Sequence, residues 1–398
     1  MKRLFALLLA ALLIFSLAAC GETVTPEPPA VPETEQSRAP SPEEPAEQER
    51  RAELARREAQ LDDILARLTL EEKVGQLFFL RCPAENAAET VEKYHLGGIL
   101  LFTRDYKDAG ENWLTREQFT DKLIALQTAA QSDIGVPLFI GSDEEGGTVT
   151  RASRNLNLFS AKFPSPQELY KAGGMDGLLT DTLRYNDALR ALGVNVNFSP
   201  VCDVTSGEGQ FMYDRSFGYD AKATADYIAQ VVDVMGKAGI GATLKHFPGY
   251  GDNVDTHTGI AVDERSYTQF EQVDFLPFIA GIEAGAPFVM VNHNIVNCMD
   301  DTYPASLSPA VHDVLRDALG FTGVILTDDL DMDAVKAYAD DGSIGVLALA
   351  AGNDMLVCSD LSQIAAICAA VEDGTLDASV IDTACRNVLT VKQTLGLL

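Results

Sequence analysis

Eight short apolar runs recur along this chain, and most are separated by segments with helical periodicity. The runs lie at residues 77–80, 98–102, 137–140, 194–198, 242–245, 288–291, 324–327 and 354–357. The amphipathic segments between them include residues 116–131, 220–237, 267–283 and 308–319. Short apolar strands joined by helices are typical of parallel β-α units. Eight such units predict an α/β fold that closes into a (β/α)8 TIM barrel. A doubly wound open sheet is the alternative, but no Gly-rich phosphate loop follows the first run.

The first twenty residues are predicted to be a lipoprotein signal peptide. A basic start over residues 1–3 precedes an apolar stretch over residues 4–17, in which Ser16 is the one polar residue. About 14 apolar residues suit a signal segment better than a membrane-spanning helix. The stretch ends in Leu-Ala-Ala-Cys at Cys20, which resembles the lipobox of bacterial lipoproteins. This resemblance implies that Cys20 is lipidated and anchors an exported chain to the outer face of the bacterial cytoplasmic membrane, on the extracellular or periplasmic side. An ordinary cleaved signal peptide is the alternative.

A Pro- and Glu-rich segment follows. Seven of the chain's 17 Pro lie between Pro26 and Pro45, among few large apolar residues. Such a composition predicts a disordered, extended tether over residues 21–55 and a single globular domain over residues 56–398. From about Glu49 to Arg67 the composition changes to Ala, Leu, Arg and Glu, which predicts a helix. Thr69 opens a Thr-Leu-Glu-Glu sequence that is typical of a helix start with a capping box.

The chain is strongly acidic, with 30 Lys and Arg against 59 Asp and Glu and a formal net charge of −29. This balance argues against a nucleic-acid partner, which requires clustered basic residues. The cysteines show no zinc spacing, and the acidic repeat that starts at Asp329 has Ala334 where a calcium loop needs Gly. We therefore expect no metal and no cofactor. The six cysteines besides Cys20 are scattered through apolar stretches, which predicts buried free thiols for most of them.

Charged and polar side chains follow most of the predicted strands. They are Asp143 to Glu145 after the third run, Asp203 after the fourth, Lys245 and His246 at the end of the fifth, His293 after the sixth, and Asp328 and Asp329 after the seventh. Burying an unpaired charge is costly, so these groups must be paired or solvated. Their positions place them around one pocket at the C-terminal end of the barrel, where barrel enzymes carry their active sites.

Five segments, taken in order, carry a family resemblance. They are Asp-Glu-Glu-Gly-Gly at 143–147, Asn-Phe-Ser-Pro-Val-Cys-Asp at 197–203, Asp-Arg-Ser-Phe-Gly at 214–218, Lys-His-Phe-Pro-Gly at 245–249 with Asp-Thr-His at 255–257, and Thr-Asp-Asp-Leu-Asp-Met at 327–332. They resemble the signature segments of glycoside hydrolase family 3, and in particular of its β-N-acetylglucosaminidase branch. The matched region runs roughly from residue 65 to residue 396. Five matches in this order are highly specific.

The resemblance implies a retaining glycosidase with three catalytic residues. Asp328 would be the nucleophile that forms a glycosyl-enzyme, and His257 would be the acid/base. Asp255 would orient the imidazole and stabilise its charged form. The two residues flank Thr256, so in an extended loop their side chains point the same way.

The strand pattern gives its own argument for Asp328. Val324, Leu326 and Asp328 share one face of a strand, so Asp328 can point into the barrel mouth while Asp329 points away. Asp329 as the nucleophile is the alternative. A structural role for Asp329, as the cap of a helix that begins near Asp331, fits it better than Asp328.

Further residues match family positions that bind the sugar beside the scissile bond. These are Asp143, Arg215, Lys245 and His246, whose carboxylate would accept from hydroxyls while the cations donate. Charge pairing of Lys245 and Arg215 with Asp203 and Asp143 is a structural alternative that is compatible with sugar binding.

The chain departs from the family pattern at two places. Thr148 stands where many members carry Arg, so a substrate contact is expected to be lost or moved to Arg151. Tyr250 stands where His is frequent. Both departures affect the expected specificity rather than the reaction type.

The sequence therefore predicts an exported exo-β-N-acetylglucosaminidase that acts on terminal β-linked N-acetylglucosamine in cell-wall (peptidoglycan) fragments. Its expected partners are this carbohydrate and, through the lipid, a membrane. The chain ends at Leu398 after a helical segment, so we expect one catalytic domain without a second one. A β-N-acetylglucosaminide phosphorylase, another family 3 β-glycosidase and a non-catalytic sugar-binding lipoprotein are the alternatives.

Overall fold

The computed structural model describes residues 43–205, 207–253, 259–338 and 344–398. The chain divides into two units, Met1–Glu53 and Leu54–Leu398, and each is described by itself. Three predicted features lie outside the described residues: the signal peptide, Cys20, and the tether up to residue 42.

Helix α1 (Glu43–Arg67) begins about six residues earlier than expected, so the last part of the predicted tether, from Glu43 to residue 55, is helical. The prediction of an extended chain was wrong over residues 43–48, whereas the helix predicted from about Glu49 is present. Glu, Ala and Arg are good helix formers, and ion pairs one turn apart stabilise the helix. In the first unit, Arg50 and Arg51 both pair with Glu47, at 2.9 and 3.0 Å.

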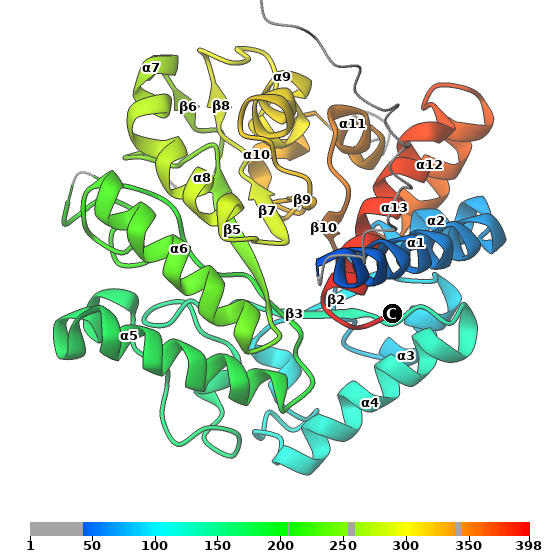
Figure 1. The fold of residues 1–398 in the computed structure, drawn as a ribbon, viewed down its shortest axis with the longest axis horizontal. Helices are drawn as coiled ribbons and strands as arrows, with labels where there is room; N and C mark the ends of the chain where they lie inside the picture. Colours follow the sequence, from blue (N-terminus) through cyan, green and yellow to red (C-terminus); the bar gives the residue numbers. More distant parts are fainter. Residues whose placement is uncertain (1–42, 206, 254–258, 339–343) are drawn as a thin grey trace, which may run out of the picture. The chain divides into compact units, whose positions relative to one another are not determined.

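The second unit is built on an eight-stranded parallel sheet with the order β10-β1-β2-β3-β4-β5-β7-β9 (Figure 1). The strands are β1 (Phe78–Arg81), β2 (Gly98–Leu101), β3 (Phe139–Ser142), β4 (Val196–Asn197), β5 (Gly241–Phe247), β7 (Phe288–Val291), β9 (Val324–Thr327) and β10 (Leu356–Cys358). The two end strands meet at a parallel bridge between Leu326 and Met355, where the Thr327 N–H donates to the Met355 carbonyl at 3.1 Å. The predicted (β/α)8 barrel is therefore confirmed, and the open sheet is not formed.

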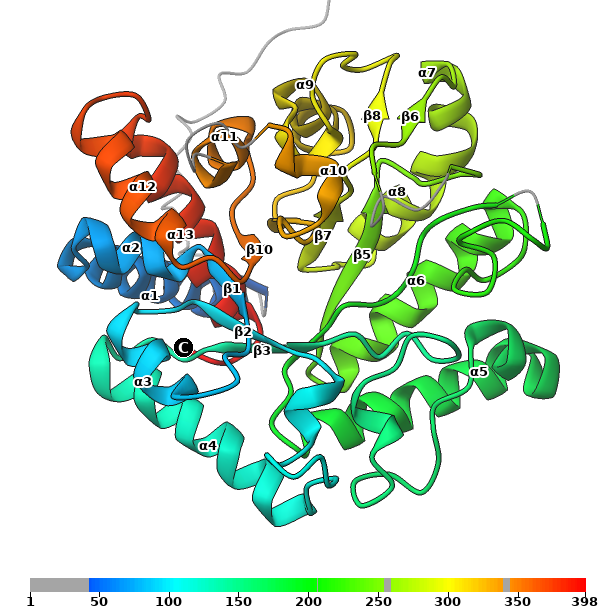
Figure 2. The same cartoon turned by 180° about the vertical axis from the view of Figure 1, so that it is seen from behind.

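Helices lie outside the strands, as seen from both sides in Figures 1 and 2. They are α2 (Leu70–Gln76), α3 (Ala87–Lys93), α4 (Arg116–Asp133), α5 (Pro166–Arg190), α6 (Ala221–Lys237), α7 (Tyr267–Gln269), α8 (Phe275–Glu283), α9 (Pro309–Asp313), α10 (Asp333–Lys336), α11 (Ile344–Ala351), α12 (Ser362–Glu372) and α13 (Ala378–Thr394). Thr69 caps α2 with the capping box that its sequence predicts. Each predicted amphipathic segment is helical, with π-helical turns that continue α7 and α9.

Four phenylalanines fill the inside of the barrel. Phe79, Phe139, Phe198 and Phe288 are each less than 2% exposed. The rings of Phe198 and Phe79, of Phe79 and Phe139, and of Phe139 and Phe288 pack in pairs with centroids 5.0–6.1 Å apart. Gly141 leaves room for this layer, because a Cβ at its position would lie 2.7 Å from the Phe79 ring. Large residues beside small ones close the interior, so the barrel is a packed core and not a pore.

Two elements were not predicted. Strands β6 (Val262–Asp263) and β8 (Ile295–Val296) form a small parallel sheet of their own. Two residues are too few for an alternating pattern to show in a sequence. This small sheet holds the chain that follows β5, which matters for the site.

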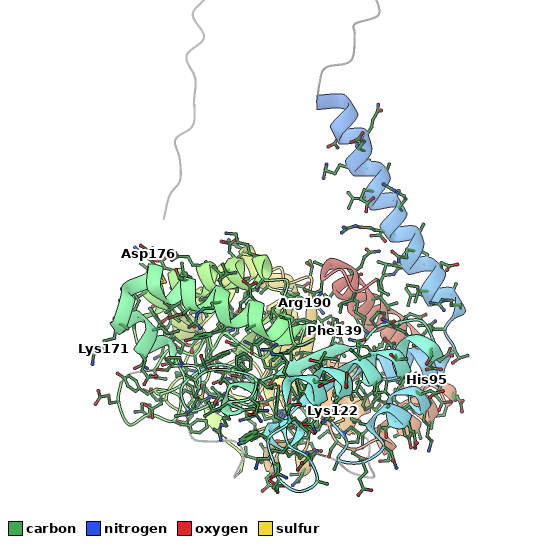
Figure 3. The ribbon with its side chains drawn as sticks, turned by 90° about the horizontal axis from the view of Figure 1, so that it is seen from below. His95, Lys122, Phe139, Lys171, Asp176 and Arg190 are labelled. Atoms are coloured by element: carbon green, nitrogen blue, oxygen red, sulfur yellow. The ribbon has the colours of Figure 1, made fainter. Side chains whose placement is uncertain are left out.

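Side-chain contacts join neighbouring elements on the outside of the barrel, and His95 and Lys122, which are labelled in Figure 3, take part in two of them. His95, which follows α3, contacts Asp133 at the end of α4, and Lys122 of α4 donates to the Asp105 carbonyl at 3.0 Å. Lys171, Asp176 and Arg190 are distributed along α5. Among the described helices, none is long and apolar enough to cross a membrane.

The six described cysteines are free thiols. Cys82, Cys202, Cys358 and Cys385 are buried, Cys368 is partly buried and Cys298 is exposed. This agrees with the expectation of buried free thiols for most of them.

Candidate active site

A buried lysine lies at the centre of the charged cluster at the C-terminal end of the strands. Lys245, in β5, is 2% exposed. Its Nζ lies 2.9 Å from Asp143 Oδ1 and 2.7 Å from Glu145 Oε1. The predicted pairing of Lys245 with Asp143 is therefore present. A lysine with two carboxylates at this distance is compensated in charge despite its burial.

Glu145 joins Lys245 to Arg215. The Arg215 Nε and Nη2 donate to the two carboxylate oxygens of Glu145 at 2.9 and 2.7 Å, which is a bidentate pair. Burial alone would raise the pKa of Glu145, but Arg215 and Lys245 outweigh it and hold that pKa well below its ordinary value. Arg215 thus forms its ion pair with Glu145 and not with Asp203. The structural alternative was therefore wrong about the partner of Arg215.

His246 lies beside this pair with a fixed tautomer. Its Nε2 lies 3.3 Å from Arg215 Nη2, and because a guanidinium can only donate, Nε2 accepts. Nδ1 therefore carries a hydrogen and donates to Asp203 Oδ2 at 2.8 Å. Asp203 Oδ1 accepts the backbone N–H of Tyr250 at 2.7 Å. The buried Tyr250 ring packs against the His246 ring, with the two ring centroids 5.6 Å apart.

Arg151 also reaches the cluster. Its Nη2 lies 3.5 Å from Asp143 Oδ2. Buried Glu144 holds the loop that carries Arg151, because its Oε1 accepts the N–H groups of Arg151 and Ser153. Burial raises the pKa of Glu144 to about 7, although these backbone bonds oppose the rise.

Asp328 and Asp329 follow β9 and have different surroundings. Asp328 is partly buried, and its Oδ1 accepts the Asp329 N–H at 2.8 Å. The Asp329 carboxylate pairs instead with Arg81 at the end of β1. Burial raises the pKa of Asp329 to about 6, with Arg81 opposing the rise.

Asp329 does not cap a helix as the sequence suggested. Its Oδ1 accepts the Asp331 N–H at 3.1 Å, which caps a turn, whereas α10 begins two residues later at Asp333 with Met332 as its N-cap. The helix start was misplaced because three acidic residues in this stretch each look like a cap.

Asp255 and His257 lie outside the described residues. The described chain on either side of them is held by one ion cluster. Arg265 pairs with Asp263 and Asp274 at 2.7 and 2.8 Å and donates to the Gly249 carbonyl at 3.0 Å. Asn253 Nδ2 donates to Asp263 Oδ2 at 2.7 Å. The cluster thus fixes both ends of the segment from Gly249 to Asp263.

The structure brings Asp143, Arg151, Arg215, Lys245 and His246 together, while Asp328 lies at the end of a strand of the same barrel. Sequence reasoning gave no role to Glu145, Arg81 or Arg265. The signal for Arg81 was present, because it directly follows the apolar run at residues 77–80, just as the predicted residues follow later runs. Glu145 belongs to the segment at 143–147, but its cationic partners Arg215 and Lys245 are 70 and 100 residues away, so no local pattern links them to it.

The cluster combines carboxylates, which can accept hydrogen bonds, with cations, which can donate them, and this combination suits a ligand that carries several hydroxyls. A carboxylate at the end of another strand of the same barrel, such as Asp328 after β9, can supply a nucleophile.

Comparison with known proteins identifies the family. The sequence profile described as "Glycosyl hydrolase family 3 N terminal domain" matches residues 69–391. A β-hexosaminidase of Nitrosomonas eutropha is 31% identical over 276 residues, which cover 67% of this chain and 74% of that protein. A β-hexosaminidase of Stenotrophomonas maltophilia is 34% identical over 247 residues, which cover 60% and 69%.

Solved structures agree. A family 3 β-N-acetylglucosaminidase from Paenibacillus sp. FPU-7 superimposes with a TM-score of 0.76 and 30% identity, covering 83% of this chain and 63% of that one. A family 3 glycosyl hydrolase from Mycobacterium smegmatis gives a TM-score of 0.72 and 30% identity, covering 82% and 98%. This chain therefore spans less than two thirds of the Paenibacillus enzyme. The profile match covers most of the chain, and the chain belongs to glycosyl hydrolase family 3.

Proposed function

We propose that the protein is a retaining exo-β-N-acetylglucosaminidase that releases terminal β-linked N-acetylglucosamine from cell-wall (peptidoglycan) fragments. One observation carries the proposal: at the C-terminal end of a family 3 barrel, a charge-compensated cluster around Lys245 accompanies Asp328 at the end of β9. Relatives named β-hexosaminidase and a structural neighbour named β-N-acetylglucosaminidase support the choice of sugar.

The proposed reaction has two steps at the anomeric carbon. In the first, Asp328 attacks that carbon, the bond to the leaving oxygen breaks, and the His257 imidazolium gives this oxygen its proton. In the second, a water molecule loses a proton to His257 and attacks the same carbon, which frees the Asp328 carboxylate. Two inversions give net retention. Asp255 orients His257 and stabilises the imidazolium.

The cluster would hold the terminal sugar. Asp143 would accept from its hydroxyls, while Lys245 and Arg215 would donate. Both cations are fixed by Glu145, so little ordering remains to be done when the sugar binds. His246 would contact the same ring, and Arg151, near Asp143, would supply a further donor.

We further propose that the enzyme is exported and held by a lipid on Cys20 at the outer face of the cytoplasmic membrane, with the segment before α1 as its tether. The lipobox-like sequence supports this. Cys20→Ala should release the enzyme from the membrane fraction and abolish its labelling by a palmitate analogue. Retention of both would contradict lipidation.

The first test of the activity uses 4-nitrophenyl β-N-acetylglucosaminide. The wild type should release nitrophenol, and NMR should show the β-anomer of the sugar as first product. Asp328→Asn should reduce kcat by at least about 10³-fold, because no nucleophile remains. The matched control is Asp333→Asn, an exposed acid of the same segment that pairs with Lys336; it should keep full activity. An inactive wild type, or an active Asp328→Asn, would contradict the proposal.

Three further measurements address the role of His257, the use of phosphate and the natural substrate. His257→Ala should reduce turnover of chitobiose far more than that of the nitrophenyl substrate, which needs no proton on its leaving group. Equal losses would contradict the acid/base role. Rates that require phosphate would indicate a phosphorylase, and faster turnover of chitobiose than of muropeptides would contradict the cell-wall substrate.

A further inference from the structure

We propose that Arg81 is a positioning residue for the nucleophile: it holds Asp329 so that the Asp329 N–H stays directed at Asp328 Oδ1. This inference rests on the proposed role of Asp328. Arg81 is the last residue of β1, and β1 is separated from β9 by β10 in the sheet. Its side chain therefore reaches past one strand to contact the segment that follows β9.

The contacts of Arg81 converge on that segment. Its Nε and Nη2 both contact Asp329 Oδ2, and its Nη1 lies 3.4 Å from Asp331 Oδ2. The Ser359 hydroxyl donates to the same Asp331 oxygen at 2.6 Å. Asp329 is 13% exposed, so its carboxylate depends on Arg81 for charge compensation.

Residue 329 is held at three points. Its carboxylate is bound by Arg81, and its carbonyl lies 3.0 Å from His293 Nε2. Because a carbonyl can only accept, Nε2 carries the hydrogen, and Nδ1 faces the Ser306 hydroxyl at 2.7 Å. The third point is the N–H that donates to Asp328 Oδ1 at 2.8 Å. With carbonyl and side chain fixed, the peptide plane before residue 329 has little freedom to turn this N–H away.

The positive charge of Arg81 also supports the proposed nucleophile. Without Arg81, a second carboxylate next to Asp328 would either repel it or take up a proton. Burial already raises the pKa of Asp329 to about 6 with Arg81 in place. Loss of the guanidinium should therefore shift the acid limb of the activity profile to higher pH.

Arg81 also connects to the sugar-binding cluster through an aromatic ring. The guanidinium carbons of Arg81 and Arg151 lie 5.3 and 5.6 Å from the centroid of the Phe102 ring. Arg151 in turn lies near Asp143. The Phe102 ring thus contacts both the arginine that holds the nucleophile segment and the arginine beside the sugar cluster, within the range of a cation–π interaction.

The test compares Arg81→Gln and Arg81→Lys with Arg316→Gln. Arg316 makes a matched pair with Asp354, whose Oδ2 accepts the Ile325 N–H at 2.7 Å, so this pair supports the same strand β9 away from its C-terminal end. Arg316 and Arg81 are 25% and 31% exposed. Loss of either pair should lower the melting temperature.

On 4-nitrophenyl β-N-acetylglucosaminide, Arg81→Gln should reduce kcat by about 10- to 100-fold with less than about a threefold change in KM, and its acid limb should move up by about one pH unit. Arg81→Lys should recover part of kcat, because it lacks the planar guanidinium that contacts Asp329 with two nitrogens. It should show the wild-type acid limb, because it keeps the positive charge. Arg316→Gln should keep the wild-type kcat and pH profile. Adding Asp329→Asn to the Arg81→Gln variant should change kcat little further, because Arg81 and Asp329 act as a unit.

Wild-type kcat and pH profile in Arg81→Gln, or an equal loss in Arg316→Gln, would overturn the inference. An active wild type with an inactive Asp328→Asn and an unaffected Arg81→Gln would refute the positioning role alone. An inactive wild type, or an active Asp328→Asn, would instead refute the proposed function and the inference with it.

Discussion

Glu144 differs from the other buried charges of the site. Glu145 is compensated by Arg215 and Lys245, and Asp203 by contacts with His246 and the Tyr250 N–H. The Oε1 of Glu144 accepts the backbone N–H groups of Arg151 and Ser153, and its buried Oε2 has no hydrogen-bond partner among the described residues. A carboxylate in this setting favours its neutral form, so Glu144 makes the stability of the protein depend on pH.

Glu144→Gln should remove that dependence. Burial raises the pKa of Glu144 from 4.5 to about 7. Between these values the folded state binds the proton more tightly than the unfolded state, so this group lowers the free energy of unfolding as pH rises, by about 3 kcal/mol in total. Gln keeps the acceptor and cannot titrate. Compared with the wild type, the variant should therefore gain stability progressively from about pH 5 to about pH 8.

Urea unfolding at several pH values measures this difference. Glu117→Gln, at an exposed position of α4, is the control and should not reproduce this gain in stability. A constant difference between Glu144→Gln and the wild type would contradict the prediction.

At the scale of elements, the chain after β5 is held by Arg265. This one side chain compensates two carboxylates that are each 1% exposed, Asp263 and Asp274. Gly249 passes so close that a Cβ there would lie 2.3 Å from Asp274 Oδ1. Burial raises the pKa of Asp274 to about 7 even though Arg265 opposes the rise, so the cluster depends strongly on its arginine.

Arg265→Met should destabilise the fold by about 3–5 kcal/mol, because it leaves two buried carboxylates uncompensated. It should also reduce kcat/KM for chitobiose more than for the nitrophenyl substrate, since Arg265 and its partners bind the described chain on both sides of the proposed acid/base. The ratio of the two kcat/KM values is the measurement. The control is Arg316→Met, which breaks the pair with Asp354 away from this segment and should destabilise the fold without changing the ratio. An unchanged ratio in Arg265→Met would exclude the anchoring role of Arg265.

The strands of the barrel were predictable because each is buried on both faces and reads as a short apolar run. Strands β6 and β8 were not, because two residues leave no pattern. The start of α1 was missed for another reason: prolines up to Pro45 suggested an extended chain, while Glu and Ala around them favour a helix that tolerates Pro in its first turn.

At the scale of the whole molecule, the site depends on pairs that no local pattern can reveal. Lys245 and Asp143 are 102 residues apart, and Arg81 and Asp329 are 248 apart. Strand ends predict which charged residues meet at the barrel mouth, since all parallel strands point the same way. They do not predict partners, because those depend on side-chain reach across neighbouring strands. This explains why the charged residues at the strand ends were predicted to lie together while Glu145 and Arg81 received no role.

The net charge of −29 also acts on the whole molecule. Repulsion among like charges destabilises a compact state, and salt screens it. The screening length falls from about 30 Å at about 0.01 M salt to about 8 Å at about 0.15 M. Raising NaCl over this range should therefore increase the melting temperature by about 2–4 °C, which corresponds to about 1 kcal/mol. KCl should act equally if screening is the cause. The Lys245 pairs are buried and screened less, so kcat should change little. A melting temperature that falls with both salts would show that surface ion pairs outweigh the repulsion.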